Sequence, residues 1–133
     1  MTKKQWSVND SDRLYNVSKW SNGYFKIEEN GQLKATPNPK KNVGIIIEDV
    51  IEEAKEQGMA LPLVIRFHDI LRSQVKLLNK TFQKVIDDED YGGRFFGVYP
   101  VKVNQMREVV EEIVDAGSRY NYGLEAGSKA ELL

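Results

Sequence analysis

The stretch Phe95-Phe-Gly-Val-Tyr-Pro-Val-Lys-Val-Asn-Gln105 sets the fold expected for the rest of the chain. Its aromatic and β-branched residues follow a glycine turn and precede a helical pattern, which is typical of a buried parallel strand over 96–103. Lys102 would lie close to the carboxyl end of that strand. Burying an ammonium group is costly unless it is paired or neutral, so a lysine held there can act as an amine. The alternative is that Lys102 lies past the strand end in solvent, as most lysines do.

Apolar strands and amphipathic helices alternate on both sides of this stretch. A nearly continuous apolar run predicts a strand over Leu61–Phe67, and Asp69 is expected to cap the helix that follows. A second helix is expected from Met106 to Gly117, and another strand over Tyr120–Ala126. Strands that alternate with helices predict a parallel sheet with right-handed crossovers. The fold class is therefore α/β, with three consecutive βα units; the resemblance described below implies that they are the first three of a (β/α)8 TIM barrel.

The first forty-two residues are expected to form a separate segment. Tyr24–Glu28 and Gln32–Ala35 flank an Asn-Gly turn, which predicts a β-hairpin. The two prolines within Thr36–Asn42 indicate a linker, and a helical pattern is expected from Val43 to Gly58. The predicted domains are therefore residues 1–42 and 43–133. An isolated hairpin is only marginally stable in water, so this one needs another surface to pack on.

Two charged residues are expected to meet at one end of the parallel sheet. Lys102 lies at the carboxyl end of its strand and Glu125 at that of the next, and such ends share one edge of a barrel. Pro100 is unusual for a central strand but can be accommodated at a strand exit. The alternative for Glu125 is a charge that caps the next helix. Ser128 and Glu131 also fit a capping box for that helix.

Composition limits the possible functions. The chain has 133 residues, of which 41% are hydrophobic and 29% charged, and a net charge of -1, which gives no reason to expect nucleic acid or a membrane as partner. The absence of cysteine and of an apolar signal segment predicts a cytoplasmic setting. The acidic run at 87–90 is interpreted as a solvated turn, so no metal ligand is predicted.

Four segments resemble the biosynthetic arginine decarboxylases, which are pyridoxal phosphate enzymes with an alanine-racemase type of barrel. They are Trp6 to Phe25, including Trp6-Ser-Val-Asn-Asp-Ser11; Leu63-Val-Ile-Arg-Phe-His-Asp-Ile-Leu71; Gly97-Val-Tyr-Pro-Val-Lys-Val-Asn-Gln105; and Leu124-Glu-Ala-Gly-Ser-Lys-Ala-Glu-Leu132. His68 departs from the pattern, since proline is expected there. The family's cofactor-stacking histidine would lie beyond Leu133, so His68 is not expected to take that role.

The resemblance implies that Lys102 forms a Schiff base with pyridoxal 5'-phosphate and that Glu125 lies beside the cofactor. The cofactor would accept the electrons left when L-arginine loses CO2, giving agmatine for polyamine biosynthesis. The N-terminal hairpin would join a β-domain contributed mostly by residues outside this chain. The resemblance also leaves room for Mg²⁺ as a second cofactor and predicts a homo-oligomer.

Two alternatives remain open from the sequence. One is a related pyridoxal phosphate barrel enzyme, such as a diaminopimelate or ornithine decarboxylase, and the Trp6 to Phe25 segment argues against it. The other is a non-catalytic fragment or regulatory paralogue that only binds a partner. Residues that bind the phosphate, recognise the substrate or supply a catalytic cysteine are expected downstream of Leu133, so the substrate comes from the resemblance alone.

Overall fold

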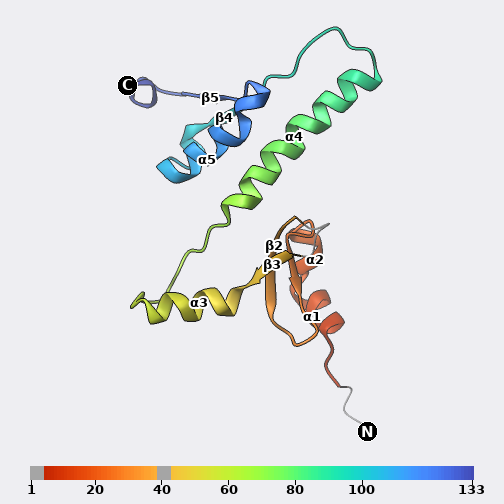
Figure 1. The fold of residues 1–133 in the computed structure, drawn as a ribbon, viewed down its shortest axis with the longest axis vertical. Coiled ribbons are helices and arrows are strands. Elements are labelled where there is room, and N and C mark those ends of the chain that lie inside the picture. Colours follow the sequence, from red (N-terminus) through yellow and green to blue (C-terminus); the bar gives the residue numbers. More distant parts are fainter. Residues whose placement is uncertain (1–4, 39–42) are drawn as a thin grey trace. The chain divides into compact units, whose positions relative to one another are not determined.

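The computed structural model describes residues 5–38 and 43–133 and shows a mixed α/β chain (Figure 1). It divides into two compact units, Met1–Arg66 and Phe67–Leu133. The predicted domain boundary after Asn42 falls at the edge of residues 39–42, which lie outside the described residues, and it stays a prediction.

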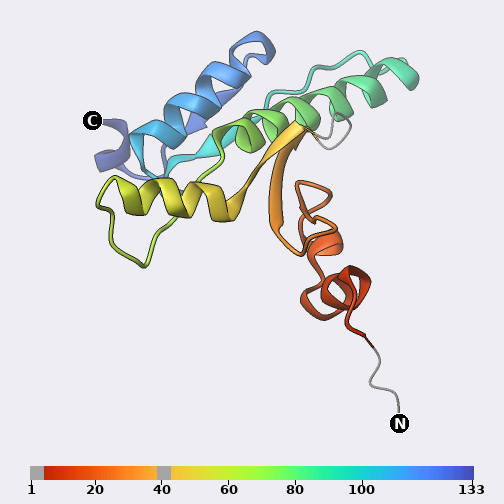
Figure 2. The ribbon, with the colours of Figure 1, turned by 60° about the horizontal axis from the view of Figure 1, so that its bottom comes forward.

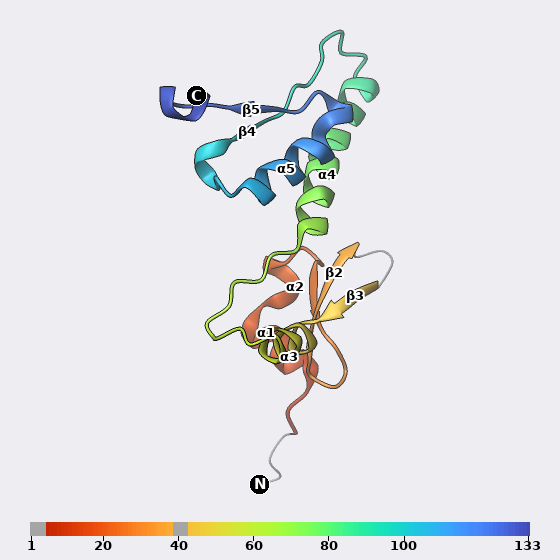
Figure 3. The same cartoon turned by 60° about the vertical axis from the view of Figure 1, so that its left-hand side comes forward.

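The first unit holds an antiparallel sheet of β1 (Phe25–Ile27), β2 (Leu33–Asn38) and β3 (Val43–Ile46), with β2 in the middle. Figure 3 labels β2 and β3. The predicted hairpin is confirmed, with Phe25 opposite Ala35 and Ile27 opposite Leu33. The elements of this unit are α1 (Val8–Tyr15), α2 (Val17–Trp20), β1 (Phe25–Ile27), β2 (Leu33–Asn38), β3 (Val43–Ile46) and α3 (Ile47–Glu56).

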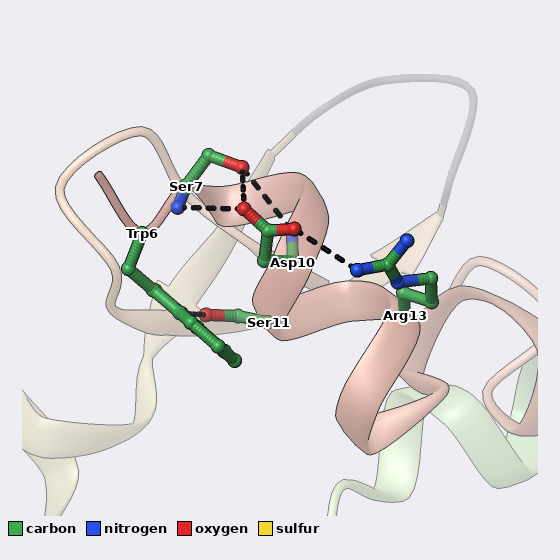
Figure 4. Close-up of polar contacts among 5 residues, drawn as sticks. All are labelled: Trp6, Ser7, Asp10, Ser11 and Arg13. Atoms are coloured by element: carbon green, nitrogen blue, oxygen red, sulfur yellow. Dashed lines mark hydrogen bonds and ion pairs between the residues drawn. The ribbon is translucent and has the colours of Figure 1, made fainter. Parts of the chain in front are cut away.

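Helix α1 begins with a capping box that the sequence predictions missed. The Ser7 hydroxyl accepts a hydrogen bond from the Asp10 amide at 3.3 Å, and the Asp10 carboxylate accepts one from the Ser7 amide at 3.1 Å (Figure 4). Arg13 donates to the other Asp10 oxygen at 3.1 Å, and Trp6 Nε1 donates to Ser11 Oγ at 2.7 Å. The signal was the spacing Ser-x-x-Asp, in which aspartate takes the place that glutamate or glutamine usually occupies.

Two predictions in this unit are wrong. The residues Val43–Ile46 form a strand, and the helix starts only at Ile47. Thr36–Asn38 belong to β2, so they are not linker. Backbone pairing explains both, because Ala35 lies opposite Ile45 and Asn38 opposite Val43. At Gly44 a Cβ atom would come 2.1 Å from the Ala35 carbonyl oxygen, so only glycine allows this close approach.

The second unit packs two helices beside a pair of parallel strands (Figures 1 and 2). Its elements are α4 (His68–Asp88), β4 (Val98–Pro100), the 3-10 turn η1 (Val101–Val103), α5 (Arg107–Gly117), the 3-10 turn η2 (Ser118–Tyr120), β5 (Gly123–Glu125) and α6 (Lys129–Leu132). The predicted helices over 71–85 and 106–117 and the parallel pairing of the last two strands are confirmed. The core consists of Val75, Val109, Ile113 and Ala116, with Leu71, Tyr99 and Tyr122 packed against it.

Three predictions in and before this unit need correction. No strand forms over 61–67, because neither sheet of the described residues offers this segment a partner and Pro62 lacks an amide donor. Both remaining strands are shorter than predicted. Asp69 lies in the first turn of α4, whose N-cap is Phe67, so it favours the helix through its charge rather than by capping. The described residues thus contain two βα units, β4–α5 and β5–α6.

Candidate functional site

The carboxyl ends of β4 and β5 form the candidate site. The parallel register pairs Tyr99 with Leu124 and Pro100 with Glu125, so the two strands end side by side. Lys102 follows in the turn η1, and Glu125 is the last residue of β5. The structure therefore brings both predicted site residues to the same end of the strand pair. It also shows that Lys102 lies just beyond its strand, with an exposed side chain, while Glu125 is half-buried.

Three charged side chains converge beside Gly127. The position that a Cβ atom on Gly127 would occupy is 3.1 Å from Glu125 Oε1, 3.6 Å from Glu131 Oε2 and 3.9 Å from Lys102 Nζ. The backbone at Gly127 therefore lies close to Glu125, and a side chain at this position would crowd that carboxylate. A primary amine with a carboxylate nearby can react with a carbonyl group while the carboxylate stabilises positive charge on the nitrogen.

The cap of α6 is made by residues other than Glu125. Ser128 Oγ accepts a hydrogen bond from the Glu131 amide at 3.3 Å, as predicted. The Glu131 carboxylate accepts from the Gly127 amide at 2.7 Å, one residue before the position that a standard capping box uses. This division leaves the Glu125 carboxylate turned toward the space beside Gly127.

The turn that carries Lys102 is anchored at both ends. Tyr99 packs against the core, and its hydroxyl donates to the Asn104 carbonyl oxygen at 3.2 Å. The Asn104 side chain in turn accepts from the Met106 amide at 3.0 Å, at the start of α5. Residues on either side of Lys102 are therefore fixed to the strand, the core and the following helix.

His68, the only histidine of the chain, lies at the edge of an ion-pair network between α4 and α5. Its Nδ1 is 3.8 Å from Glu112 Oε1. Arg72 donates to Glu112 Oε2 at 2.5 Å and also pairs with Asp115. The hydrogen bonds that Arg72 donates to Glu112 and, second, to Asp115 raise the pKa of its guanidinium. This network was not predicted, since its members are about forty positions apart along the chain.

Residues 5–38 and 43–133 contain no group of three or more His, Cys, Asp or Glu side chains that could hold a metal ion. Within the acidic run at 87–90, Asp87 accepts from Gln83 at 2.8 Å and Asp88 pairs with Lys84. The Mg²⁺ for which the resemblance left room thus has no such ligand set among the described residues. None of the helices described is long and apolar enough to cross a membrane.

Comparison with known proteins confirms the resemblance seen in the sequence. No family model matches the chain. A relative from Gloeobacter violaceus is 43% identical over 130 residues, which are 98% of this chain and 20% of the relative. One from Deinococcus radiodurans is 43% identical over 123 residues, 92% of this chain and 18% of the relative. A crystal structure from Campylobacter jejuni gives a TM-score of 0.79 at 37% identity, covering 89% of this chain and 19% of that one.

In sequence and fold, the chain is therefore related to a group of decarboxylases. These relatives are the biosynthetic arginine decarboxylases, a name that all three matched proteins carry. The chain spans about 20% of the length of the relatives that it matches.

Proposed function

We propose that this chain is the N-terminal part of a biosynthetic arginine decarboxylase, a carboxy-lyase that converts L-arginine to agmatine and CO2. The observation that carries the proposal is the strand-end pair of Lys102 and Glu125 in a chain 43% identical to enzymes of that name. The proposal includes polyamine biosynthesis as the pathway, the cytoplasm as the location and a homo-oligomer as the assembled state.

The proposed architecture is a (β/α)8 barrel of alanine-racemase type, to which β4–α5 and β5–α6 contribute consecutive units. Two features support it: the parallel register of β4 and β5, and the helix that follows each strand. In such barrels the reacting groups lie at the carboxyl ends of the strands, which is where Lys102 and Glu125 lie. The antiparallel sheet β1-β2-β3 would belong to a separate β-domain.

The residues at this site fit pyridoxal 5'-phosphate. Lys102 offers the exposed primary amine that would hold the cofactor covalently, and glycine at 127 avoids a side chain that would crowd the Glu125 carboxylate. When bound, the cofactor supplies an electron sink for the pair left on the substrate after CO2 departs. Glu125 would stabilise positive charge near the amine nitrogen, and the contact of Tyr99 with Asn104 would orient the turn.

The related diaminopimelate and ornithine decarboxylases are not favoured, because the relatives reported above are named as arginine decarboxylases. A regulatory paralogue would share the fold but would not carry a cofactor on Lys102. Covalent labelling of Lys102 therefore distinguishes a decarboxylase from a regulatory paralogue.

The test is borohydride reduction of the full-length protein that contains these residues, followed by peptide mapping. The expected result is a pyridoxyl group on Lys102 in the wild type and on no peptide in Lys102→Ala. Lys129→Ala is the control, since it removes a nearby exposed lysine on α6 and should leave labelling of Lys102 intact. A label on Lys129, or no label at all, would overturn the assignment.

A further inference from the structure

A hollow of about 450 Å³ lies at the amino ends of β4 and β5, at the opposite end of the strands from Lys102. Arg94 lines it from the segment before β4, and Arg119 lines it from the turn η2 before β5. Lys80 contributes a third cation from α4. Three positive charges therefore lie around one concave surface. They come from the segments before β4 and β5 and from α4, which are far apart along the chain.

No carboxylate balances these charges within the part of the chain that the structure describes. The lining of the hollow contains neither aspartate nor glutamate. Elsewhere Arg13, Arg72 and Arg107 each pair with an acidic side chain, whereas Lys80, Arg94 and Arg119 have no such partner among the described residues. Like charges around one hollow repel one another, and a bound anion would relieve that repulsion.

The walls of the hollow are ordered by contacts of their own. The Arg119 guanidinium lies 5.3 Å from the centre of the Tyr120 ring, which favours one orientation of a long side chain. Asn79 is only 3% exposed, and its amide donates to the Val75 carbonyl oxygen at 2.8 Å. An arginine guanidinium group can donate two parallel hydrogen bonds to the oxygens of one phosphate group. Two arginines and a lysine therefore suit a ligand with several phosphate oxygens.

We propose that this hollow binds a small, multiply charged oxyanion of the phosphate class, either inorganic or as part of an organic phosphate ester. The proposal does not depend on the decarboxylase assignment, since none of its residues lies at the carboxyl ends of the strands. A ligand here would contact the residues that precede β4 and β5. Lys102 and Glu125 lie at the opposite, carboxyl ends of the same two strands. The site is therefore suited to binding a phosphate compound as a regulatory ligand and not to catalysing a reaction.

Isothermal titration calorimetry of the full-length protein with inorganic pyrophosphate tests the proposal. Arg94→Gln and Arg119→Gln should each weaken binding about tenfold, and the double variant should show no heat of binding. Arg107→Gln removes the same charge from an exposed face of α5 and should leave the affinity unchanged.

Two further measurements complete the test. Adenosine monophosphate and citrate, titrated in parallel, distinguish an organic phosphate ester and a polycarboxylate from inorganic pyrophosphate; tighter binding of citrate would contradict the phosphate class. Without ligand, the variants should have the same unfolding midpoints as the wild type. A loss of affinity can then be attributed to the missing arginine and not to unfolding. An absence of binding heat in the wild type, or an equal loss in Arg107→Gln, would overturn the proposal.

Discussion

Glu125 lies opposite Pro100 in the parallel register of β5 and β4. Pro100 is the last residue of its strand, a position where a proline is tolerated because the ladder ends there. The chain then enters the turn η1, so Lys102 is presented beyond the sheet instead of within it. Pro100 thus marks the end of β4. The register places the Glu125 carboxylate beside that end, next to the turn that carries Lys102.

Replacing Glu125 by glutamine tests its role beside the amine. A nearby negative charge favours the protonated form of a nitrogen, so its removal should lower the pH at which the bound cofactor changes its absorption. The measurement is a spectrophotometric pH titration of the full-length protein. Glu108→Gln, in the first turn of α5, is the control and should leave the titration unchanged. An unchanged titration in Glu125→Gln would indicate a purely structural role.

Substitutions at Gly127 test whether the site needs the close approach of this backbone to Glu125. An added Cβ would lie 3.1 Å from Glu125 Oε1, closer than ordinary contact, so Gly127→Ala should speed loss of the cofactor several-fold and Gly127→Val more. Absorbance of the protein after dialysis measures the retained cofactor. At Gly92 an added Cβ meets nothing within 4 Å, so Gly92→Ala is the matched control. Equal retention in all three variants would show that the cofactor does not depend on glycine at this position.

The core of the second unit predicts a large effect at Ile113. This residue is 4% exposed between α4 and α5, so Ile113→Ala should reduce the stability of this unit by about 2–5 kcal/mol. Its neighbour Val114 is 39% exposed, and Val114→Ala should change stability by less than about 1 kcal/mol. Hydrogen exchange of α5 amides measures both. A similar loss of protection in the two variants would contradict the assigned packing.

The contact between α1 and α2 should depend on pH. The pKa of Asp12 is lowered chiefly by hydrogen bonds from the Ser18 hydroxyl and amide, at 2.7 and 2.9 Å. Its stabilising contribution is therefore present above the pKa of the unfolded chain and is lost as pH falls through the lower folded pKa. Ser18→Ala should raise the Asp12 pKa in an NMR titration, whereas Ser11→Ala, also on α1, should not. A shift of equal size in both would contradict this assignment.

Residues 1–133 alone should lack decarboxylase activity and fold poorly. Large apolar side chains stay exposed, including Val64 at 76%, Tyr91 at 66% and Phe82 at 45%. Each square ångström of apolar surface left in water forgoes about 25 cal/mol, against a net stability of about 5–15 kcal/mol for an ordinary domain. A denaturation curve and hydrogen exchange test this. A cooperative, monomeric transition with protected amides in β4 and β5 would show an autonomous domain.

The sequence by itself determined the elements that depend on local patterns. The apolar period of 3.6 predicted α4 and α5, the Asn30-Gly31 turn predicted the hairpin, and the alternation of strands and helices predicted that β4 and β5 run parallel. From that alternation alone, Lys102 and Glu125 were expected at one end of the sheet. These signals lie within a few residues of one another, so no knowledge of distant partners was needed.

Only the tertiary structure decided which apolar runs became strands and which charges met. The residues Val43–Ile46 pair with β2 and become a strand, while 61–67 find no partner and do not. The pairing of Arg72 with Glu112, the convergence on Gly127 and the cations around the hollow likewise join residues from different elements. A strand is stabilised by hydrogen bonds to a neighbour, and a charge by groups packed against it, and neither partner can be identified from the local sequence.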